Sequence, residues 1–163
     1  MRKAKKIYLS LGSNVGDRAA NLAAGAAALD AAGVRVVEQS SLYATEPVYF
    51  QTQSWFLNCV VAAETNLMPR QLLRVVREIE RRLGRRLVRG GPRVLDIDIL
   101  FYGGAVVRAR ELEIPHPRLA ERRFVLVPLR EIAPALRHPV LGKTIAELLA
   151  DLRDRSRVMK YRG

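Results

Sequence analysis

The chain has 163 residues, of which 49% are hydrophobic and 27% are charged, and its formal net charge is +12. This length and composition predict a single soluble domain over residues 1–163 and exclude an intrinsically disordered chain. The apolar stretches are too short to span a bilayer, the N-terminus lacks a signal-peptide pattern, and Cys59 is the only cysteine. We therefore expect a cytoplasmic protein without a membrane partner.

The predicted elements follow one another without a repeat or a linker. In chain order they are a strand at 6–11, a helix at 18–32, a strand at 34–43, a loop at 44–54, a strand at 55–64, a helix at 69–83 and a strand at 94–102. Asp17 is expected to cap the first helix and Gly33 to end it. Pro69 occupies the favoured first position of the second helix, and Gly84 stops that helix.

This order of elements, βαββαβ, predicts an α+β protein with a ferredoxin-like core. Its sheet is antiparallel and both helices cover one face, which leaves the other face free for ligands. After residue 103 we expect a C-terminal extension of the same domain, with a short strand at 105–108 and short helices near Leu129 and Ile145. The highly charged residues 153–163 are expected to form a frayed end.

Two aspartates in the last predicted strand point to a site. Alternate side chains of a strand lie on opposite faces, so Asp96 and Asp98 share one face. Leu95, Ile97 and Ile99 share the other and should pack against the helices. Two neighbouring carboxylates repel each other unless a cation lies between them. Because Mg²⁺ is usually bound by one or two carboxylates together with substrate phosphates, the pair predicts phosphoryl chemistry.

The segment that leads into this strand combines glycine with Arg85, Arg86, Arg89 and Arg93. Guanidinium groups can bind a polyphosphate and stabilise the charge of a moving phosphoryl group. The segment lacks the Gly-Lys-Ser/Thr of a P-loop, so it is not a Walker-type site. A solvated basic loop is the alternative for this segment alone, and the adjacent aspartates favour the phosphate role.

Three other segments carry candidate ligand-binding groups, each with a structural alternative. Asn58 shares a strand face with Phe56, and its amide suits the edge of a planar heterocycle or a bond to a neighbouring loop. The loop at 43–48 could close over a ligand or be an ordinary connection. His116 could donate to a phosphate or to the backbone, and Phe124 could stack on a flat ligand or fill the core.

Taken together, these segments resemble the 6-hydroxymethyl-7,8-dihydropterin pyrophosphokinase family of folate biosynthesis. The likeness extends from Ile7 to about Leu149. It is carried by Leu11-Gly12-Ser13-Asn14-Val15-Gly16-Asp17-Arg18, Tyr43-x-Thr45-x-Pro47, Phe56-Leu57-Asn58, Gly91-Pro92-Arg93-Val94-Leu95-Asp96-Ile97-Asp98-Ile99 and Pro115-His116-Pro117-Arg118, with Arg122 and Phe124.

The resemblance implies transfer of the β,γ-diphosphate of ATP to the hydroxymethyl group of the pterin, which releases AMP and uses two Mg²⁺ ions. By that likeness the catalytic residues are Arg85, Arg93, Asp96 and Asp98, and the two aspartates bind the metal. The implied pterin contacts are Thr45, Pro47, Val48, Phe56, Asn58 and Phe124. The implied ATP contacts are Arg86, Arg89, Arg93, Ile99, His116 and Arg122.

Three positions depart from the family pattern. The segment between Gly84 and Gly91 is short, Gly90 stands where an aromatic residue is common, and Pro117 replaces an aromatic that follows the histidine in some members. The features that these departures affect are the match of Arg86 to the family's second lid arginine and the closure of a tryptophan over the pterin. None of them removes a metal ligand or Asn58.

Two other function classes compete with this prediction. A basic ferredoxin-like module that binds nucleic acid without catalysis would need stacked aromatics in the RNP patterns, which the sequence lacks. The Asp96 and Asp98 carboxylates would also repel its phosphates. A catalytically silent protein would not need the aspartate pair together with Arg93 and Asn58. We therefore expect small-molecule substrates and no nucleic-acid partner. The sequence does not fix the oligomeric state, for which a monomer is favoured.

Overall fold

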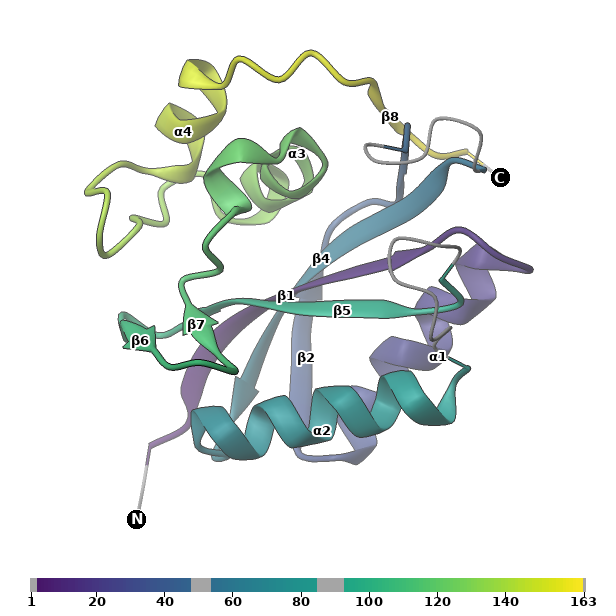
Figure 1. The fold of residues 1–163 in the computed structure, drawn as a ribbon, viewed down its shortest axis with the longest axis vertical. Coiled ribbons are helices and arrows are strands. Elements are labelled where there is room, and N and C mark those ends of the chain that lie inside the picture. The colour runs from purple at the N-terminus through teal and green to yellow at the C-terminus, as the bar shows by residue number, and fades with distance from the viewer. Residues whose placement is uncertain (1–2, 48–53, 85–92, 163) are drawn as a thin grey trace.

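The protein is described here by a computed structural model that covers residues 3–47, 54–84 and 93–162, and an antiparallel sheet forms its centre (Figure 1). The strand order is β5-β1-β4-β3-β8, and β2 also pairs with β4. The elements are β1 (Lys5–Ser13), α1 (Arg18–Ala31), β2 (Val34–Gln39), β3 (Tyr43–Thr45), β4 (Phe56–Thr65), α2 (Pro69–Arg82), β5 (Asp96–Tyr102), β6 (Val107–Arg108), β7 (Glu113–Ile114), a 3-10 helix (Leu119–Glu121), α3 (Arg123–Ile132), α4 (Ile145–Asp151) and β8 (Val158–Lys160).

Helices α1 and α2 cover one face of this sheet, as the sequence predicts, and lie below it in Figure 1. Leu9 of β1 is buried together with Leu72 and Ile79 of α2 in the core between the two layers. The Asp17 carboxylate accepts a hydrogen bond from the backbone N–H of Ala20 at 3.1 Å and so caps α1. The alternating strands and the amphipathic helix thus form the predicted ferredoxin-like core.

The opposite face is only partly open, which corrects the expectation that this face is free for ligands. Helices α3 and α4 pack on it and lie above the sheet in Figure 1. Leu126, Leu129 and Leu148 from these helices form a second core with Val60 of β4 and Phe101 of β5. The C-terminal extension therefore buries apolar side chains of the sheet that would otherwise be exposed to water. Any ligand must bind beside this layer.

The predicted second strand is divided into two. Its residues form β2 and β3, which pair with opposite ends of β4. At the break, the Ser40 hydroxyl accepts a hydrogen bond from Val60 N at 3.0 Å, and Ser40 N donates to Val60 O at 2.9 Å. Strand β3 extends to Thr45, so the connection predicted to begin at residue 44 starts later. The side-chain hydrogen bond of Ser40 replaces one step of the regular ladder.

The predicted frayed C-terminal end is also wrong. Strand β8 pairs antiparallel with β3, and Thr45 lies opposite Val158. Without this partner, β3 would present a row of unpaired backbone groups at the sheet edge. The backbone hydrogen bonds of this ladder hold the charged segment against the sheet. The strand predicted at 105–108 is present as the shorter β6, which pairs with β7.

Candidate active site

The sheet register brings the two halves of the predicted site into one row. Gly12 of the central strand β1 pairs with Asp96 of β5 on one side and with Asn58 of β4 on the other. In the next row of the same face, Ser10 pairs with Asp98. Ile97 is buried in the core beneath α1 and α2, so the predicted division of β5 into an acidic face and an apolar face is confirmed.

The Asn58 amide is buried and fixed by a neighbouring strand. Its side-chain nitrogen donates to the hydroxyl oxygen of Thr45 at 2.6 Å, and both residues are less than 5% exposed. This hydrogen bond is the structural role that the sequence left open. It uses one of the two amide hydrogens and leaves a ligand the other hydrogen and the carbonyl lone pairs. Asn58 can therefore have both roles.

Gly12 makes room for this arrangement. A Cβ atom at Gly12 would lie 2.5 Å from Asn58 Oδ1 and 3.6 Å from a ring carbon of Phe56. Real Cβ atoms essentially never approach an oxygen so closely. The absent side chain lets the Asn58 amide lie across β1, beside the Phe56 ring. The glycine belongs to a motif that the sequence predicts just after the first strand, but it lies within β1, and its specific role becomes visible only once the register is known.

Four residues predicted to be functional meet around Asp98, in the next row of the same face. Arg122 Nη1 lies 3.9 Å from Asp98 Oδ2, and His116 Nε2 lies 4.0 Å from Asp98 Oδ1. The Arg122 guanidinium stands 5.6 Å from the centre of the Phe124 ring. Asp98, which is 35% exposed, is thus in contact range of two potential cations beside an aromatic surface. This cluster offers groups for a ligand that carries both a flat ring and a negative charge.

The charge and tautomer of His116 follow from its surroundings. Burial lowers its pKa to about 4, with smaller lowering by Arg122 and Arg118 and an opposing effect of Asp96. The imidazole is therefore neutral at neutral pH. Its Nδ1 accepts a hydrogen bond from Arg118 N at 3.1 Å, which leaves the proton on Nε2, the nitrogen that faces Asp98. His116 can donate one hydrogen bond into the site without adding a charge.

Arg93 is held at the entrance to β5 by Asn14. The backbone N–H of Arg93 donates to Asn14 Oδ1 at 2.6 Å, and Asn14 N donates to Arg93 O at 2.9 Å. Asn14 is 4% exposed, so this pair of bonds replaces the hydration of buried polar groups. The Gly-Ser-Asn motif of the sequence thus connects the end of β1 to the start of the acidic strand. Its purpose could not be derived from the sequence alone.

Glu80 is a supporting residue that sequence reasoning missed. Its carboxylate, 3% exposed, accepts a hydrogen bond at 2.8 Å from the backbone N–H of Ile97, the residue between the two aspartates. The signal was present, because Glu80 lies four and eight residues after Val76 and Leu72 on the apolar stripe of α2. A carboxylate at such a position indicates a buried partner.

Not every predicted site residue can be placed. Arg85, Arg86, Arg89 and Val48 lie outside the residues that the structure describes. Pro47 is buried at the end of the described segment that follows β3. Ile99 is 5% exposed and belongs to the core beneath the helices, so its predicted ATP contact can only involve its backbone.

The carboxylate pair suits a metal that takes most of its ligands from elsewhere. In the described ranges, no group of three or more His, Cys, Asp or Glu side chains could hold a metal ion alone. Mg²⁺ commonly binds one or two carboxylates and fills its octahedron with phosphate oxygens and water. The half-buried Asp96 and Asp98 fit that donor set. Their fit depends on a phosphate-bearing ligand.

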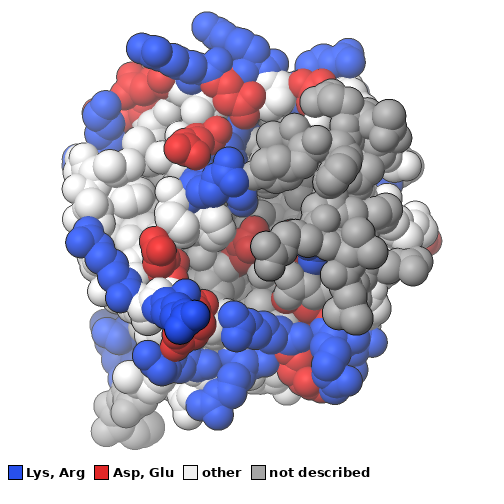
Figure 2. Space-filling model, viewed as in Figure 1, with Lys and Arg blue, Asp and Glu red and all other residues white. Residues whose placement is uncertain are grey.

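Basic side chains of the described residues gather away from the centre of the face seen in Figure 2. Lys and Arg form a band along the lower edge of Figure 2, where α2 lies in Figure 1. On helix α2 itself, Arg81 forms an exposed ion pair with Glu78. Helix α2 contains five arginines and two glutamates, a net +3 of the chain's +12.

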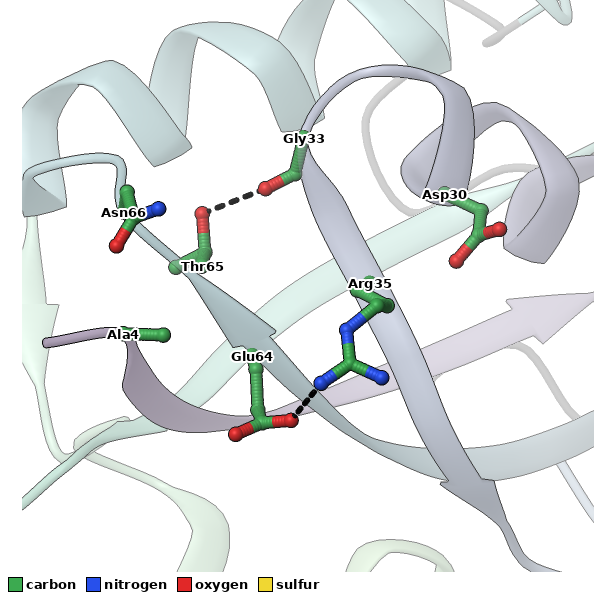
Figure 3. Close-up of a pocket in the computed structure, with 7 residues that line it drawn as sticks. All are labelled: Ala4, Asp30, Gly33, Arg35, Glu64, Thr65 and Asn66. Atoms are coloured by element: carbon green, nitrogen blue, oxygen red, sulfur yellow. Dashed lines mark hydrogen bonds and ion pairs between the residues drawn. The ribbon is translucent and has the colours of Figure 1, made fainter.

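A separate hollow of about 330 Å³ lies at the far end of β4 from Asn58 (Figure 3). It is lined by Ala4, Asp30, Gly33, Arg35, Glu64, Thr65 and Asn66. The Arg35 guanidinium pairs with the Glu64 carboxylate across it, and the Thr65 hydroxyl donates to Gly33 O at 2.8 Å. The lining includes no predicted site residue, so this hollow is distinct from the row at Gly12.

Comparison with known families decides between the function classes. Residues 8–134 match the family described as 7,8-dihydro-6-hydroxymethylpterin-pyrophosphokinase. The chain belongs to this family. The matched range contains the whole row at Gly12 and the cluster around Asp98, and it confirms the resemblance drawn from the sequence motifs. The alternative of a nucleic-acid-binding module receives no support.

Individual relatives agree with membership of the pyrophosphokinase family. A 2-amino-4-hydroxy-6-hydroxymethyldihydropteridine pyrophosphokinase of Methylorubrum extorquens is 51% identical over 149 residues, which cover 90% of this chain and 93% of that protein. The enzyme of the same name from Bacillus subtilis is 46% identical over 127 residues, covering 77% and 76%. The "Folic acid synthesis protein fol1" of Pneumocystis carinii is 42% identical over 149 residues, but this chain spans only 20% of that protein.

Solved structures support the fold. Wild-type HPPK-DHPS of Plasmodium falciparum superposes with a TM-score of 0.73 at 18% sequence identity, over 92% of this chain and 45% of that chain. At this identity the likeness concerns the fold, and it confirms the α+β class. In the part of the chain that the structure describes, no helix is long and apolar enough to cross a membrane.

Proposed function

We propose that this pyrophosphokinase-family chain transfers the β,γ-diphosphate of ATP to the hydroxymethyl group of 6-hydroxymethyl-7,8-dihydropterin, with the row at Gly12 as its site. The products are AMP and the pterin diphosphate, a step of folate synthesis. The observation that carries the proposal is the register that sets Asp96 and Asn58 on either side of Gly12. This register supports the proposal because a carboxylate that could bind metal and phosphate, and an amide that could bind a heterocycle, then flank the same glycine.

The pterin is assigned to the Asn58 side of the row. The Asn58 amide, oriented by Thr45, can pair with the polar edge of the heterocycle, and the Phe56 ring lies beside it. Phe124 supplies a second aromatic surface from α3. Pro47 and Val48 complete the expected contacts, by likeness to the family. This set recognises a flat, polar ring.

The triphosphate is assigned to the Asp98 side. Arg122 and Arg93 can bind phosphate oxygens, and the neutral His116 can donate from Nε2. Arg85, Arg86 and Arg89, together with Ile99, are the remaining ATP contacts expected from the family. These groups hold the transferred phosphate in line with the attacking hydroxyl, and orientation of this kind provides much of the rate enhancement.

Asp96 and Asp98 are the residues that would hold Mg²⁺, and we propose two ions. Bound there with ATP, the metal would neutralise phosphate charge that develops during transfer. The two carboxylates contribute by their fixed spacing on one strand face, which Glu80 supports from behind through the Ile97 N–H. We further propose that the chain acts in the cytoplasm on these small molecules, as a monomer and without nucleic acid.

The direct test is a reaction of the purified protein with ATP, Mg²⁺ and 6-hydroxymethyl-7,8-dihydropterin, followed by chromatography of the nucleotides. We expect AMP and pterin diphosphate in equal amounts. Formation of ADP, or no turnover after confirmation of the fold by circular dichroism, would contradict the proposal. Omission of the pterin controls for ATP hydrolysis, and omission of Mg²⁺ tests the metal requirement.

A further inference from the structure

The segment after α4 has no part in the proposed chemistry, yet it returns to the sheet beside the pterin side of the site. Strand β8 pairs with β3, the strand that carries Thr45. Beyond the ladder, Tyr161 N donates to Leu42 O at 2.8 Å, and Glu46 N donates to Arg157 O at 3.3 Å. The ladder and these bonds hold β3 along its outer edge from Leu42 to Glu46.

Arg157 contacts residues next to both Thr45 and Phe56. Its backbone N–H donates to the Glu46 carboxylate at 2.7 Å, and Glu46 directly follows Thr45. Its guanidinium stands 5.0 Å from the centre of the Trp55 ring, and Trp55 directly precedes Phe56. The residue just before β8 therefore connects the end of β3 with the start of β4.

A second arginine reinforces the same junction. Arg18, at the start of α1, donates from Nη1 to the backbone oxygen of Trp55 at 2.9 Å. Its guanidinium also lies 5.7 Å from the centre of the Tyr161 ring. Trp55 is thus held through its ring by Arg157 and through its backbone by Arg18. The ring contact comes from the C-terminal segment itself. The backbone contact comes from an arginine that also lies against Tyr161 of that segment.

We propose that Arg157, held in place by its backbone bond to Glu46, is a positioning residue for the pterin, and that the contact of its guanidinium with Trp55 sets the pterin affinity without affecting ATP. The proposal rests on the function assigned above. Thr45 and Asn58 form their 2.6 Å hydrogen bond across β3 and β4, so the spacing of these strands at their ends decides where the amide lies. β5, which carries the aspartates, is at the opposite end of the strand order from β8.

The test compares Arg157→Met with Arg155→Met. Methionine keeps an apolar stem but removes the cation, and Arg155 is an exposed arginine two residues earlier in the same segment. In Arg157→Met we expect the KM for the pterin to rise about two- to fivefold, the range that loss of one exposed cation–π contact implies. The KM for ATP and kcat should stay within a factor of about 1.5 of wild type. Arg155→Met should match wild type in all three.

A double-mutant cycle with Trp55→Leu identifies the contact. If the guanidinium acts through the ring, the pterin KM of the double variant will equal that of the worse single variant. Equal shifts in both KM values, an unchanged pterin KM in Arg157→Met, or additive effects would overturn the inference while leaving the proposed function intact. Absence of AMP formation by wild type would instead overturn the proposed function and this inference with it.

Discussion

Asn58 and Asp96 have the same register partner, Gly12, and are therefore separated by one strand. Neighbouring strands lie about 4.8 Å apart, which puts the two backbones roughly 10 Å from each other. A ligand pair that contacts both residues must lie across β1. The pterin ring and the transferred phosphate of the proposed reaction match this span, since the ring can rest on one side and the phosphate on the other.

The first prediction concerns Gly12. In Gly12→Ala the new Cβ would displace the Asn58 amide, so we expect the KM for the pterin to rise about tenfold or more, equivalent to about 1.4 kcal/mol. The KM for ATP should change little. Steady-state kinetics with each substrate varied in turn measures both. Gly104→Ala is the matched control, because no atom lies within 4 Å of a Cβ at that glycine. Equal KM values in the two variants would refute the steric role of Gly12.

The second prediction separates the Thr45 hydroxyl from the shape of its side chain. Thr45→Val keeps the shape but removes the acceptor of the buried Asn58 amide. We expect a loss of about 1–3 kcal/mol in the free energy of unfolding, together with weaker pterin binding. Denaturant titration and a pterin binding isotherm measure these effects. Thr45→Ser retains the hydroxyl, so its free energy of unfolding and its pterin affinity should be close to those of wild type. If the serine variant loses as much stability and affinity as the valine variant, packing rather than the hydrogen bond is responsible.

The third prediction tests the acidic pair. Asp96→Asn and Asp98→Asn preserve size but remove the negative charge of each carboxylate. AMP formation should fall roughly 10²–10³-fold or more in either variant, with the melting temperature within a few degrees of wild type. Rates are measured at saturating ATP over a range of Mg²⁺ concentrations, because lost metal affinity can be partly offset by more metal. A variant that keeps wild-type turnover at low Mg²⁺ would exclude its aspartate from metal binding.

The fourth prediction uses Cys59 as a reporter of the fold. Burial raises the pKa of its thiol to about 12, and the side chain is 1% exposed. At pH 8 the native protein should therefore react with a thiol reagent such as DTNB far more slowly than the same protein in guanidinium chloride. The labelling rate of the native protein should be limited by unfolding, and it should decrease further when ligands stabilise the folded state. Immediate stoichiometric labelling of the native protein would show that β4 opens without global unfolding.

Local sequence patterns predicted the parts of the fold that depend on neighbouring residues. The alternation of Ile97 and Asp98 correctly divided β5 between the core and the site, and Asp17 correctly marked the start of α1. These predictions succeed because strand alternation and helix capping act over a few residues. The same local patterns predicted the order of helices and strands, and from that order the ferredoxin-like core.

Features that depend on distant partners could not be predicted. The charged segment around Arg157 has the composition of a free end, and its strand forms only because β3 offers an unpaired edge. The break at Ser40 depends on Val60, twenty residues away. The shared row at Gly12 depends on the register of three strands. Hydrophobic patterns indicate which face of a strand is buried, but they do not say which residues pair across strands. The sequence could therefore list candidate residues, but it could not predict how the strands arrange the ones that the structure describes.

Beside the ladder of β8 and β3, a hydrogen bond joins two residues that are 111 positions apart, Arg157 and Glu46. A chain is synthesised from its N-terminus, and pairings between distant segments form late because loop closure costs entropy. During synthesis on a ribosome, β1, β4 and β5 can pair while the outer edge of β3 still lacks its strand. A nascent or prematurely terminated chain would thus expose a strand edge that can associate with other chains.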